Sequence, residues 1–342
     1  MFEEQSYKAV FSKVRASAQT HRIIRDMEPE SKSRRAAPLR KAVGTVLAAV
    51  LVMMLSVTAF AAVTGAEWFD IFFREGNEVP LSESQVAYIH ENTVDISRSV
   101  THEGYTVSVE CAISDGYTLY MNVKLTAPEG VVLNADDYGF VYQNRSQFYP
   151  ADGSNPARSG SWHMVNDDPN DNTVYFPMKW QGEGLHIGSK WILDLTDVAQ
   201  YQQREDGSLE ETILAKGNFR FEITIAGTGD YEVELLEQPL AYTAKVYDSD
   251  TEYREVEIAL TSVVLRPMSA NIKIEGWNDT FRLAGFAMLK VVMKDGTAVE
   301  MTMRSGGNGE NGYSLSAPVI MEEVDHILLP DGTGIPMPAL EG

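Results

Sequence analysis

The feature that most constrains this chain is an uncharged apolar stretch from Ala42 to Val63. Its 22 residues include only three polar side chains, those of Thr45, Ser56 and Thr58. An α-helix rises about 1.5 Å per residue, so this length matches the roughly 30 Å hydrocarbon core of a bilayer. A core helix of a soluble domain normally keeps a polar stripe, which this stretch lacks. The sequence therefore predicts one transmembrane helix over residues 42–63.

This stretch divides the charge of the chain unevenly. Residues 1–41 carry ten Lys and Arg against five Asp and Glu, whereas residues 64–342 carry 18 against 44. Arg34, Arg35, Arg40 and Lys41 precede the stretch, and basic flanks favour the cytoplasmic side of a membrane. We therefore expect a single-pass protein of the cell membrane, with a cytoplasmic N-terminus, an extracellular C-terminus and these four basic residues at the membrane interface.

A secretory signal peptide is the alternative interpretation of the same stretch. Ala59-Phe60-Ala61 fits an A-x-A cleavage site behind a basic leader and an apolar region. Both the leader and the apolar region are longer than usual for such signals, which favours an uncleaved signal-anchor. Within the predicted helix, Gly44 and Ala48 form a small-xxx-small pair, the basis for expecting a weak homodimer.

Residues 1–41 are predicted to form a cytoplasmic helical segment followed by a basic juxtamembrane linker. Two groups of apolar residues recur at the spacing of one helix face. Helices of about ten residues are marginal alone in water, so an exposed apolar face indicates a partner. The candidate partner-binding residues are Tyr7, Val10, Phe11, Val14, Ile23, Ile24 and Met27.

Residues 64–100 are predicted to form an aromatic juxtamembrane segment and a short helix. Aromatic side chains favour the interface between membrane and water, and Trp68, Phe69, Phe72 and Phe73 are therefore expected there. The helix is expected after Pro80-Leu81, where Ser82 and Gln85 have the spacing of a capping box.

Residues 101–232 are predicted to form a first β-sandwich domain. Apolar and polar residues alternate over 105–113 and 119–125, on either side of a turn at Ser114-Asp115-Gly116. Further strands are expected at 174–180, 190–195 and 219–225. Cys111, the only cysteine, is expected on the buried face, and a single thiol forms neither an intramolecular disulfide nor a Cys₄ zinc site.

Residues 233–342 are predicted to form a second β-sandwich domain. A strand is expected over 256–265, a hairpin over 289–303 across Asp295-Gly296, and a closing pair at 324–329 and 335–338. Its length is that of one immunoglobulin-like sandwich. The predicted fold class is therefore mainly β, with two extracytoplasmic immunoglobulin-like domains after the transmembrane helix.

Sequence motifs of catalysis are absent: there is no G-x-S-x-G, Walker loop, G-x-G-x-x-G after a strand or H-E-x-x-H. We therefore expect no catalytic residue, metal site or cofactor, and a protein that is not an enzyme. Asp168, Asn170 and Asn172 match the start of an EF-hand loop, but Thr173 and Lys179 replace its Gly and final Glu. A solvated turn is favoured there, and the acidic exterior argues against nucleic acid as a partner.

Five short segments and the apolar stretch together carry a family resemblance. The segments are Tyr7–Met27, Trp68–Phe73, Tyr88–Thr93, Ser114–Tyr120, and Leu329–Thr333 with Ile335-Pro336. In this order they resemble the membrane-anchored, anti-sigma-factor-like proteins of Gram-positive bacteria, whose exterior carries a domain of unknown function with an immunoglobulin-like fold. The resemblance implies an extracytoplasmic-function sigma factor as a partner, encoded by a neighbouring gene.

The expected function is therefore that of a single-pass membrane signalling regulator, anti-sigma-factor-like, which senses or binds an unidentified envelope ligand outside and holds a partner inside. The alternative is a cell-surface binding or structural β-sandwich protein that has no sigma partner. Deleting residues 2–30 distinguishes the two, because only the regulator would lose its effect on transcription.

Overall fold

The computed structural model describes residues 81–135, 137–141, 147–154, 158–166, 168–204, 207–226, 232–247, 252–276, 283–307 and 309–340. These residues belong to one compact unit. In this part of the chain, no helix is both long and apolar enough to cross a membrane. The predicted transmembrane helix, the cytoplasmic segment and the aromatic segment lie outside the described residues.

The one α-helix among the described residues, α4 (Glu83–Asn92), begins with the predicted capping box. The Gln85 backbone N–H donates to Ser82 Oγ at 3.2 Å, and the Ser82 N–H donates to Gln85 Oε1 at 2.8 Å. This exchange satisfies two N–H groups that the first helical turn leaves without partners. The helix presents Ile89, which is 2% exposed, to the β strands that follow.

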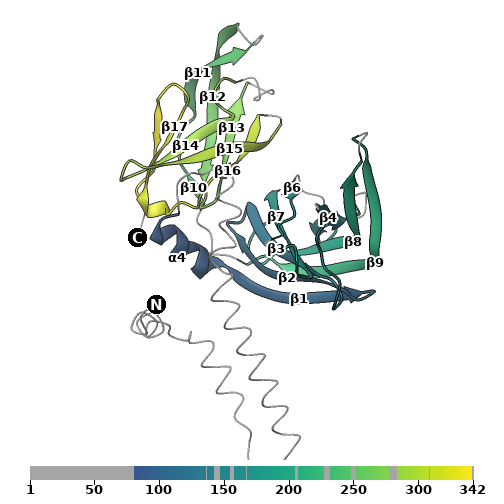
Figure 1. Ribbon diagram of the computed structural model, residues 1–342. Coiled ribbons are helices and arrows are strands. Elements are labelled where there is room, and N and C mark those ends of the chain that lie inside the picture. Colours follow the sequence, from purple (N-terminus) through teal and green to yellow (C-terminus); the bar gives the residue numbers. More distant parts are fainter. Residues whose placement is uncertain are drawn as a thin grey trace, which may run out of the picture. The chain divides into compact units, whose positions relative to one another are not determined.

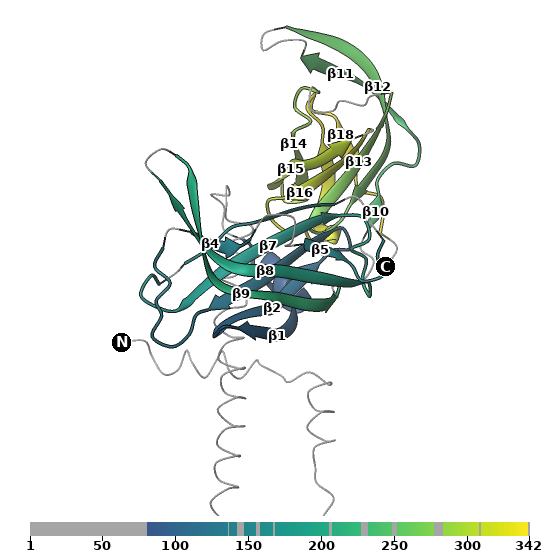
Figure 2. The same ribbon diagram turned by 90° about the vertical axis from the view of Figure 1, so that its right-hand side faces the viewer.

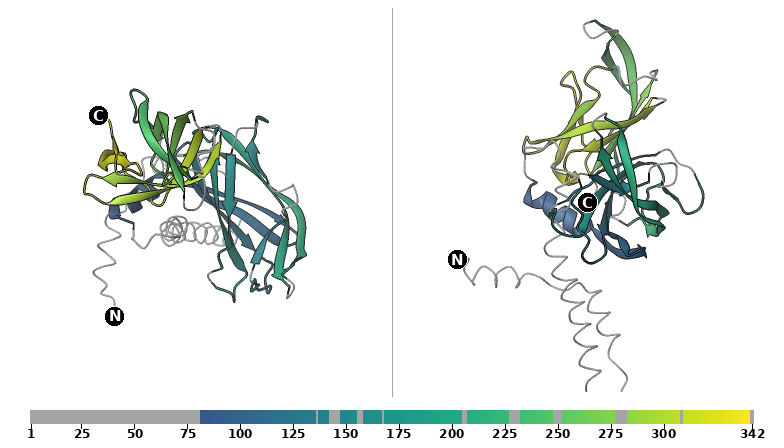
Figure 3. Two further views of the ribbon diagram at one scale, coloured as in Figure 1. Left: turned by 90° about the horizontal axis from the view of Figure 1, so that it is seen from above. Right: turned by 45° about the vertical axis from the view of Figure 1, so that its right-hand side comes forward.

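The first β region (residues 94–226) contains two antiparallel sheets (Figure 1). In the five-stranded sheet the order is β1 (Val94–His102), β2 (Tyr105–Ser114), β3 (Thr118–Thr126), β7 (Thr173–Gly182) and β6 (Arg158–Trp162). In the four-stranded sheet β8 (Lys190–Gln203) pairs with β4 (Asp137–Phe140), β5 (Gln147–Pro150) and β9 (Leu209–Thr224). The strands curve around a common core in the view from above (Figure 3).

Both sheets contribute to that core, which is rich in aromatic rings. Phe176 of β7 and Phe140 of β4 lie 5.2 Å apart between ring centroids. Strands β1 and β9 connect the two sheets, because Arg98 Nη1 donates to the Glu222 carbonyl at 2.6 Å. The period-two pattern of the sequence thus places one apolar face of each sheet against the other.

The second β region (residues 232–340) contains a single nine-stranded antiparallel sheet. Its order is β10 (Val233–Glu234), β12 (Tyr253–Leu265), β13 (Ser269–Glu275), β16 (Glu310–Leu315), β15 (Ala298–Gly307), β14 (Met288–Met293), β17 (Val324–Leu328) and β18 (Gly334–Pro336), with β11 (Leu240–Tyr247) also paired to β12. A short 3₁₀ turn, η2 (Met321–Glu323), precedes β17. The β11–β12 hairpin extends beyond the other strands of its sheet (Figure 2).

The prediction of a mainly β chain is confirmed. The hairpin across Asp295-Gly296 has the expected register, with Leu289 opposite Met301 and Val291 opposite Val299. One continuous sheet, however, occupies the second β region, where two packed sheets were predicted. The predicted division between residues 232 and 233 stays a prediction, since all described residues form one compact unit.

The predicted position of Cys111 on the core face of β2 is wrong. The register between β2 and β3 shifts between Val109 and Ala112, which marks a β-bulge. Because side chains alternate with period two, one extra residue moves the following side chains to the opposite face. Ala112 therefore takes the core position at 5% exposure, and Cys111 is only half-buried.

Candidate functional site at the junction of the β regions

The turn between β2 and β3 is folded by the carboxylate of Asp115. Its Oδ1 accepts the backbone N–H of Tyr117 at 3.1 Å and that of Thr118 at 2.7 Å. Gly116 has φ +88°, a left-handed conformation that glycine adopts at low cost. The predicted turn at Ser114-Asp115-Gly116 is confirmed, and its mechanism is an Asx-type turn.

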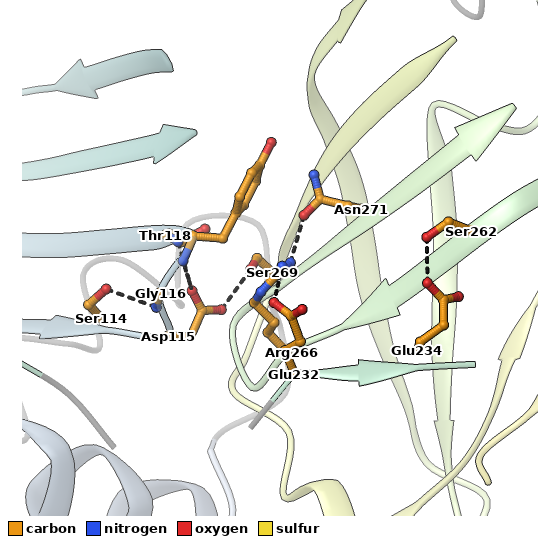
Figure 4. Close-up of polar contacts among 11 residues, drawn as sticks. Ser114, Asp115, Gly116, Thr118, Glu232, Glu234, Ser262, Arg266, Ser269 and Asn271 are labelled. Carbon is orange, nitrogen blue, oxygen red and sulfur yellow. Dashed lines mark hydrogen bonds and ion pairs between the residues drawn. The ribbon is translucent and has the colours of Figure 1, made fainter. Parts of the chain in front are cut away.

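The second oxygen of the same carboxylate reaches the second β region. Asp115 Oδ2 accepts the Met268 backbone N–H at 3.0 Å. It also accepts the Ser269 hydroxyl at 2.7 Å (Figure 4). Met268 lies in the loop between β12 and β13, and Ser269 is the first residue of β13, so the donors are 153 and 154 residues further along the chain than Asp115. One carboxylate therefore shapes a turn in the first β region and binds a loop of the second. We call this contact the junction.

Arg266 lies on the other side of the same turn. Its guanidinium carbon is 5.2 Å from the centroid of the Tyr117 ring, within the range of a cation–π contact. The guanidinium also donates to Asn271 Oδ1 at 2.7 Å and pairs with Glu232 at 2.6 Å (Figure 4). With a side chain only 12% exposed, Arg266 holds the Tyr117 ring against the second β region.

A buried amide gives the junction a second polar contact. Gln181, near the end of β7, is 2% exposed and donates through Nε2 to the Tyr313 carbonyl of β16 at 2.8 Å. The Ser314 hydroxyl donates to Gln181 Oε1 at 3.4 Å. A buried amide left without partners would cost about 1–3 kcal/mol, so these contacts favour one particular placement of β7 against β16.

An apolar cluster excludes water from the same contact. Ile89 of α4, Ile113 of β2, Tyr120 of β3 and Met268 of the β12–β13 loop are each at most 2% exposed and pack together. Burial raises the pKa of the Tyr120 hydroxyl, and the nearby carboxylate of Asp115 adds to this effect. The phenol is therefore neutral at physiological pH.

Lys179 is the unusual ionisable group of the junction. Its Nζ lies 5.0 Å from the centroid of the Tyr120 ring. Burial, followed by the positive charge of Arg304 on β15, lowers the pKa of Lys179 to about 7, although the Asp115 carboxylate opposes this shift. The amine is thus held in an environment that disfavours its charged form.

A cavity of about 460 Å³ lies between the start of α4 and the second β region. Leu81, Gln85, Met293, Val299 and Ile320 are among its lining residues. Gln85 Nε2 is already bonded to the Pro318 carbonyl at 2.8 Å. The cavity combines apolar walls with hydroxyl and amide groups, as many small-molecule sites do.

These sites consist of hydrogen bonds, one ion pair, buried apolar contacts and one cavity. No group of three or more His, Cys, Asp and Glu side chains in the described ranges could hold a metal ion. The turn expected in place of an EF-hand loop is present, with Asp168 Oδ1 accepting the Asn170 N–H at 2.9 Å. The junction combines the hydrogen bonds of Asp115 and Gln181 with one lysine whose charge is disfavoured.

None of the candidate site residues that the sequence predicted is part of the described junction. The predicted partner-binding residues between Tyr7 and Met27 and the predicted interface residues between Arg34 and Phe73 are outside the described residues. Sequence reasoning missed the junction, because Asp115 and Ser269 are 154 residues apart and neither has a distinctive motif. The available signal was the turn itself, since an Asp at that position has a second oxygen free to bind elsewhere.

Cys111 is expected to be nearly inert in the folded protein. Burial, then the negative charges of Glu110 and Asp95, raises the pKa of its thiol to about 12 from the ordinary 9.0. Only the thiolate is nucleophilic, so at pH 8 alkylation by iodoacetamide should be about 10³-fold slower in the native than in the urea-unfolded chain. Mass spectrometry of the alkylated fraction over time measures this ratio, and equal rates would contradict the raised pKa.

Comparisons with known proteins leave the family open. No protein-family model matches the chain, and no curated protein matches it. A conserved domain protein from Bacillus anthracis is similar over 75% of this chain and 82% of its own, with 14% identity and a TM-score of 0.46. S. aureus TarS is similar over 73% of this chain and 46% of its own, with 11% identity and a TM-score of 0.19. At such low identities and TM-scores, neither similarity assigns a function.

Proposed function

We propose that this protein is a single-pass membrane signalling regulator of the anti-sigma-factor-like kind. The observation that carries the proposal is the apolar stretch Ala42–Val63, with a net charge of +5 before it and −26 after it. This asymmetry orients the chain, so that residues 1–41 face a cytoplasmic partner and residues 64–342 face the envelope. The partner is an extracytoplasmic-function sigma factor, as the family resemblance implies.

The exterior serves to receive a signal. Its two β regions share the junction around Asp115 and Gln181, so a ligand that changes their relative placement would have a defined contact to break or strengthen. In the same proposal the first β region is immunoglobulin-like, and its two antiparallel sheets around one core support this assignment.

The interior binds its partner through the apolar face that contains Phe11. A charge placed on that face should abolish association, because an unpaired buried carboxylate is strongly disfavoured. Co-purification of the neighbouring-gene sigma factor with the full chain in detergent is expected for wild type and expected to be lost in Phe11→Asp. The matched control is Ala9→Asp, which adds the same charge on the opposite side of the predicted helix and should retain binding.

Two outcomes would overturn this assignment. One is that the wild-type chain does not retain the sigma factor, and the other is that Ala9→Asp and Phe11→Asp lose binding equally. If deletion of residues 2–30 leaves transcription unchanged while the exterior still folds, the protein is instead a cell-surface binding or structural protein. Intact-mass measurement of the membrane-extracted chain shows whether it is cut after Ala61, which would separate the two ends.

A further inference from the structure

We propose that Lys179 makes the junction between the two β regions respond to pH, loosening the contact when the amine carries a proton. This pH response does not require a cytoplasmic sigma factor. The junction is then a conformational device, a contact whose strength depends on one titratable side chain.

The backbone places Lys179 at the contact. It lies on the same face of β7 as Gln181, two residues further along, whose amide binds the Tyr313 carbonyl of β16. Across the sheet, Lys179 is paired with Tyr120 on the neighbouring strand β3, and its amine lies over the ring of that tyrosine. Lys179 therefore lies on the strand that meets the second β region, with its amine over a buried member of the apolar cluster.

A like charge approaches from the second β region. Arg304 is the extra residue of a β-bulge in β15, where the pairing with β16 shifts between Met303 and Ser305. Bulges redirect side chains, and the positive charge of Arg304 acts on both Lys179 and Tyr120. Closing the junction thus brings two cations together and removes one of them partly from water.

The remaining groups around the amine do not cancel this cost. The carboxylate of Asp115 in the β2–β3 turn attracts the amine, but it already accepts four hydrogen bonds. Tyr120 contributes a neutral phenol, and the partner of Lys179 on β6 is the uncharged Ser161. The balance is a pKa of about 7 against the ordinary 10.5.

The coupling between proton binding by Lys179 and opening of the junction determines the direction of the pH dependence. An amine whose pKa is lowered in the closed junction and ordinary in the open one binds its proton more tightly when the junction is open. Between about pH 10.5 and 7 each unit of acidification therefore favours opening by about ten-fold. Below about pH 7 both forms are protonated, so the dependence ends.

Hydrogen exchange of the Met268 amide reports the opening, because that N–H is bonded to Asp115 across the junction. We suggest measuring its protection factor by millisecond-mixing exchange and mass spectrometry on the full chain in nanodiscs from pH 6 to 9. For wild type, protection should fall about ten-fold per unit between pH 9 and about 7 and level off below. Lys179→Met should remove the slope, and Lys179→Arg should hold protection at the low, neutral-pH level throughout.

Two further variants make the test decisive. Lys190→Met removes an exposed lysine of β8 that pairs with Glu222 and should leave the wild-type profile unchanged. Arg304→Gln alters an exposed side chain and removes a positive charge that lowers the pKa of Lys179. It should therefore raise the pH below which protection levels off, and this result does not depend on whether Lys179→Met folds. A slope that persists in Lys179→Met, wild-type protection in Lys179→Arg at pH 9, or an unchanged levelling-off pH in Arg304→Gln would overturn the inference.

Discussion

Replacing Trp191 with alanine is expected to lower the free energy of unfolding of the first β region by about 3–5 kcal/mol. Trp191 is 1% exposed and stacks on Phe148, with ring centroids 4.8 Å apart and planes at 18°. Its Nε1 donates to the Gly184 carbonyl at 3.1 Å and to Ser189 Oγ at 3.0 Å. The substitution removes the largest fully buried side chain among the residues that the structure describes, and it leaves a cavity in a close-packed core.

Pulse proteolysis of the full chain across a urea series measures this loss without relying on the deleted fluorophore. Trp191→Phe is the matched control, because it keeps an aromatic ring against Phe148 while it removes part of the indole and the N–H that bonds Gly184 and Ser189. It should cost about 1–3 kcal/mol, the range for leaving a buried polar group without its partner. If Trp191→Ala cost no more than Trp191→Phe, the stacking and packing assigned to Trp191 would be wrong.

Features that depend on neighbouring residues could be predicted from the sequence. The capping box at Ser82 and Gln85 requires only a spacing of three, and the turn at Asp295-Gly296 requires only a dipeptide between alternating runs. Both are present with the expected partners. Local chemistry specifies these elements, so tertiary packing has little opportunity to change them.

Features that depend on register or on distant partners could not be predicted. The bulge that turns Cys111 away from the core has no signature in the local pattern, because Val109, Cys111 and Ile113 alternate without interruption. Short strands such as β4 and β5, with four residues each, are too brief to establish a period. Sequence patterning also predicted two packed sheets for the second β region, where one continuous sheet forms, because a period-two pattern does not specify which strands pair.

The junction contains one feature that depends on neighbouring residues and others that depend on distant partners. An Asp followed by Gly predicts the turn between β2 and β3, yet nothing local indicates that its second oxygen binds Met268 and Ser269. The pKa of Lys179 is likewise lowered first by burial and then by the charge of Arg304, which belongs to the other β region. Residues that act between β regions are therefore the ones that a single sequence conceals, and substitutions at the junction are the most informative experiments.

Replacing Asp115 with alanine is expected to weaken the junction by about 2–4 kcal/mol, because it removes a charged acceptor shared by four donors. The two β regions should then unfold in separate transitions. Calorimetry of the full chain in nanodiscs measures this as two resolved peaks. Asp295→Ala is the first control, since the Asp295 carboxylate accepts from Thr297 within its own turn. That substitution should cost about 1 kcal/mol without separating the transitions.

Asp115→Asn isolates the contact between the β regions from the turn. Asparagine also stabilises Asx-type turns, so its oxygen can still accept from the Tyr117 and Thr118 amides. Its NH₂ group replaces the oxygen that accepts from Met268, and two donors then face each other. The β2–β3 turn should therefore survive while the Met268 amide loses its protection from hydrogen exchange. Retained protection in Asp115→Asn would show that the carboxylate does not hold the two β regions together.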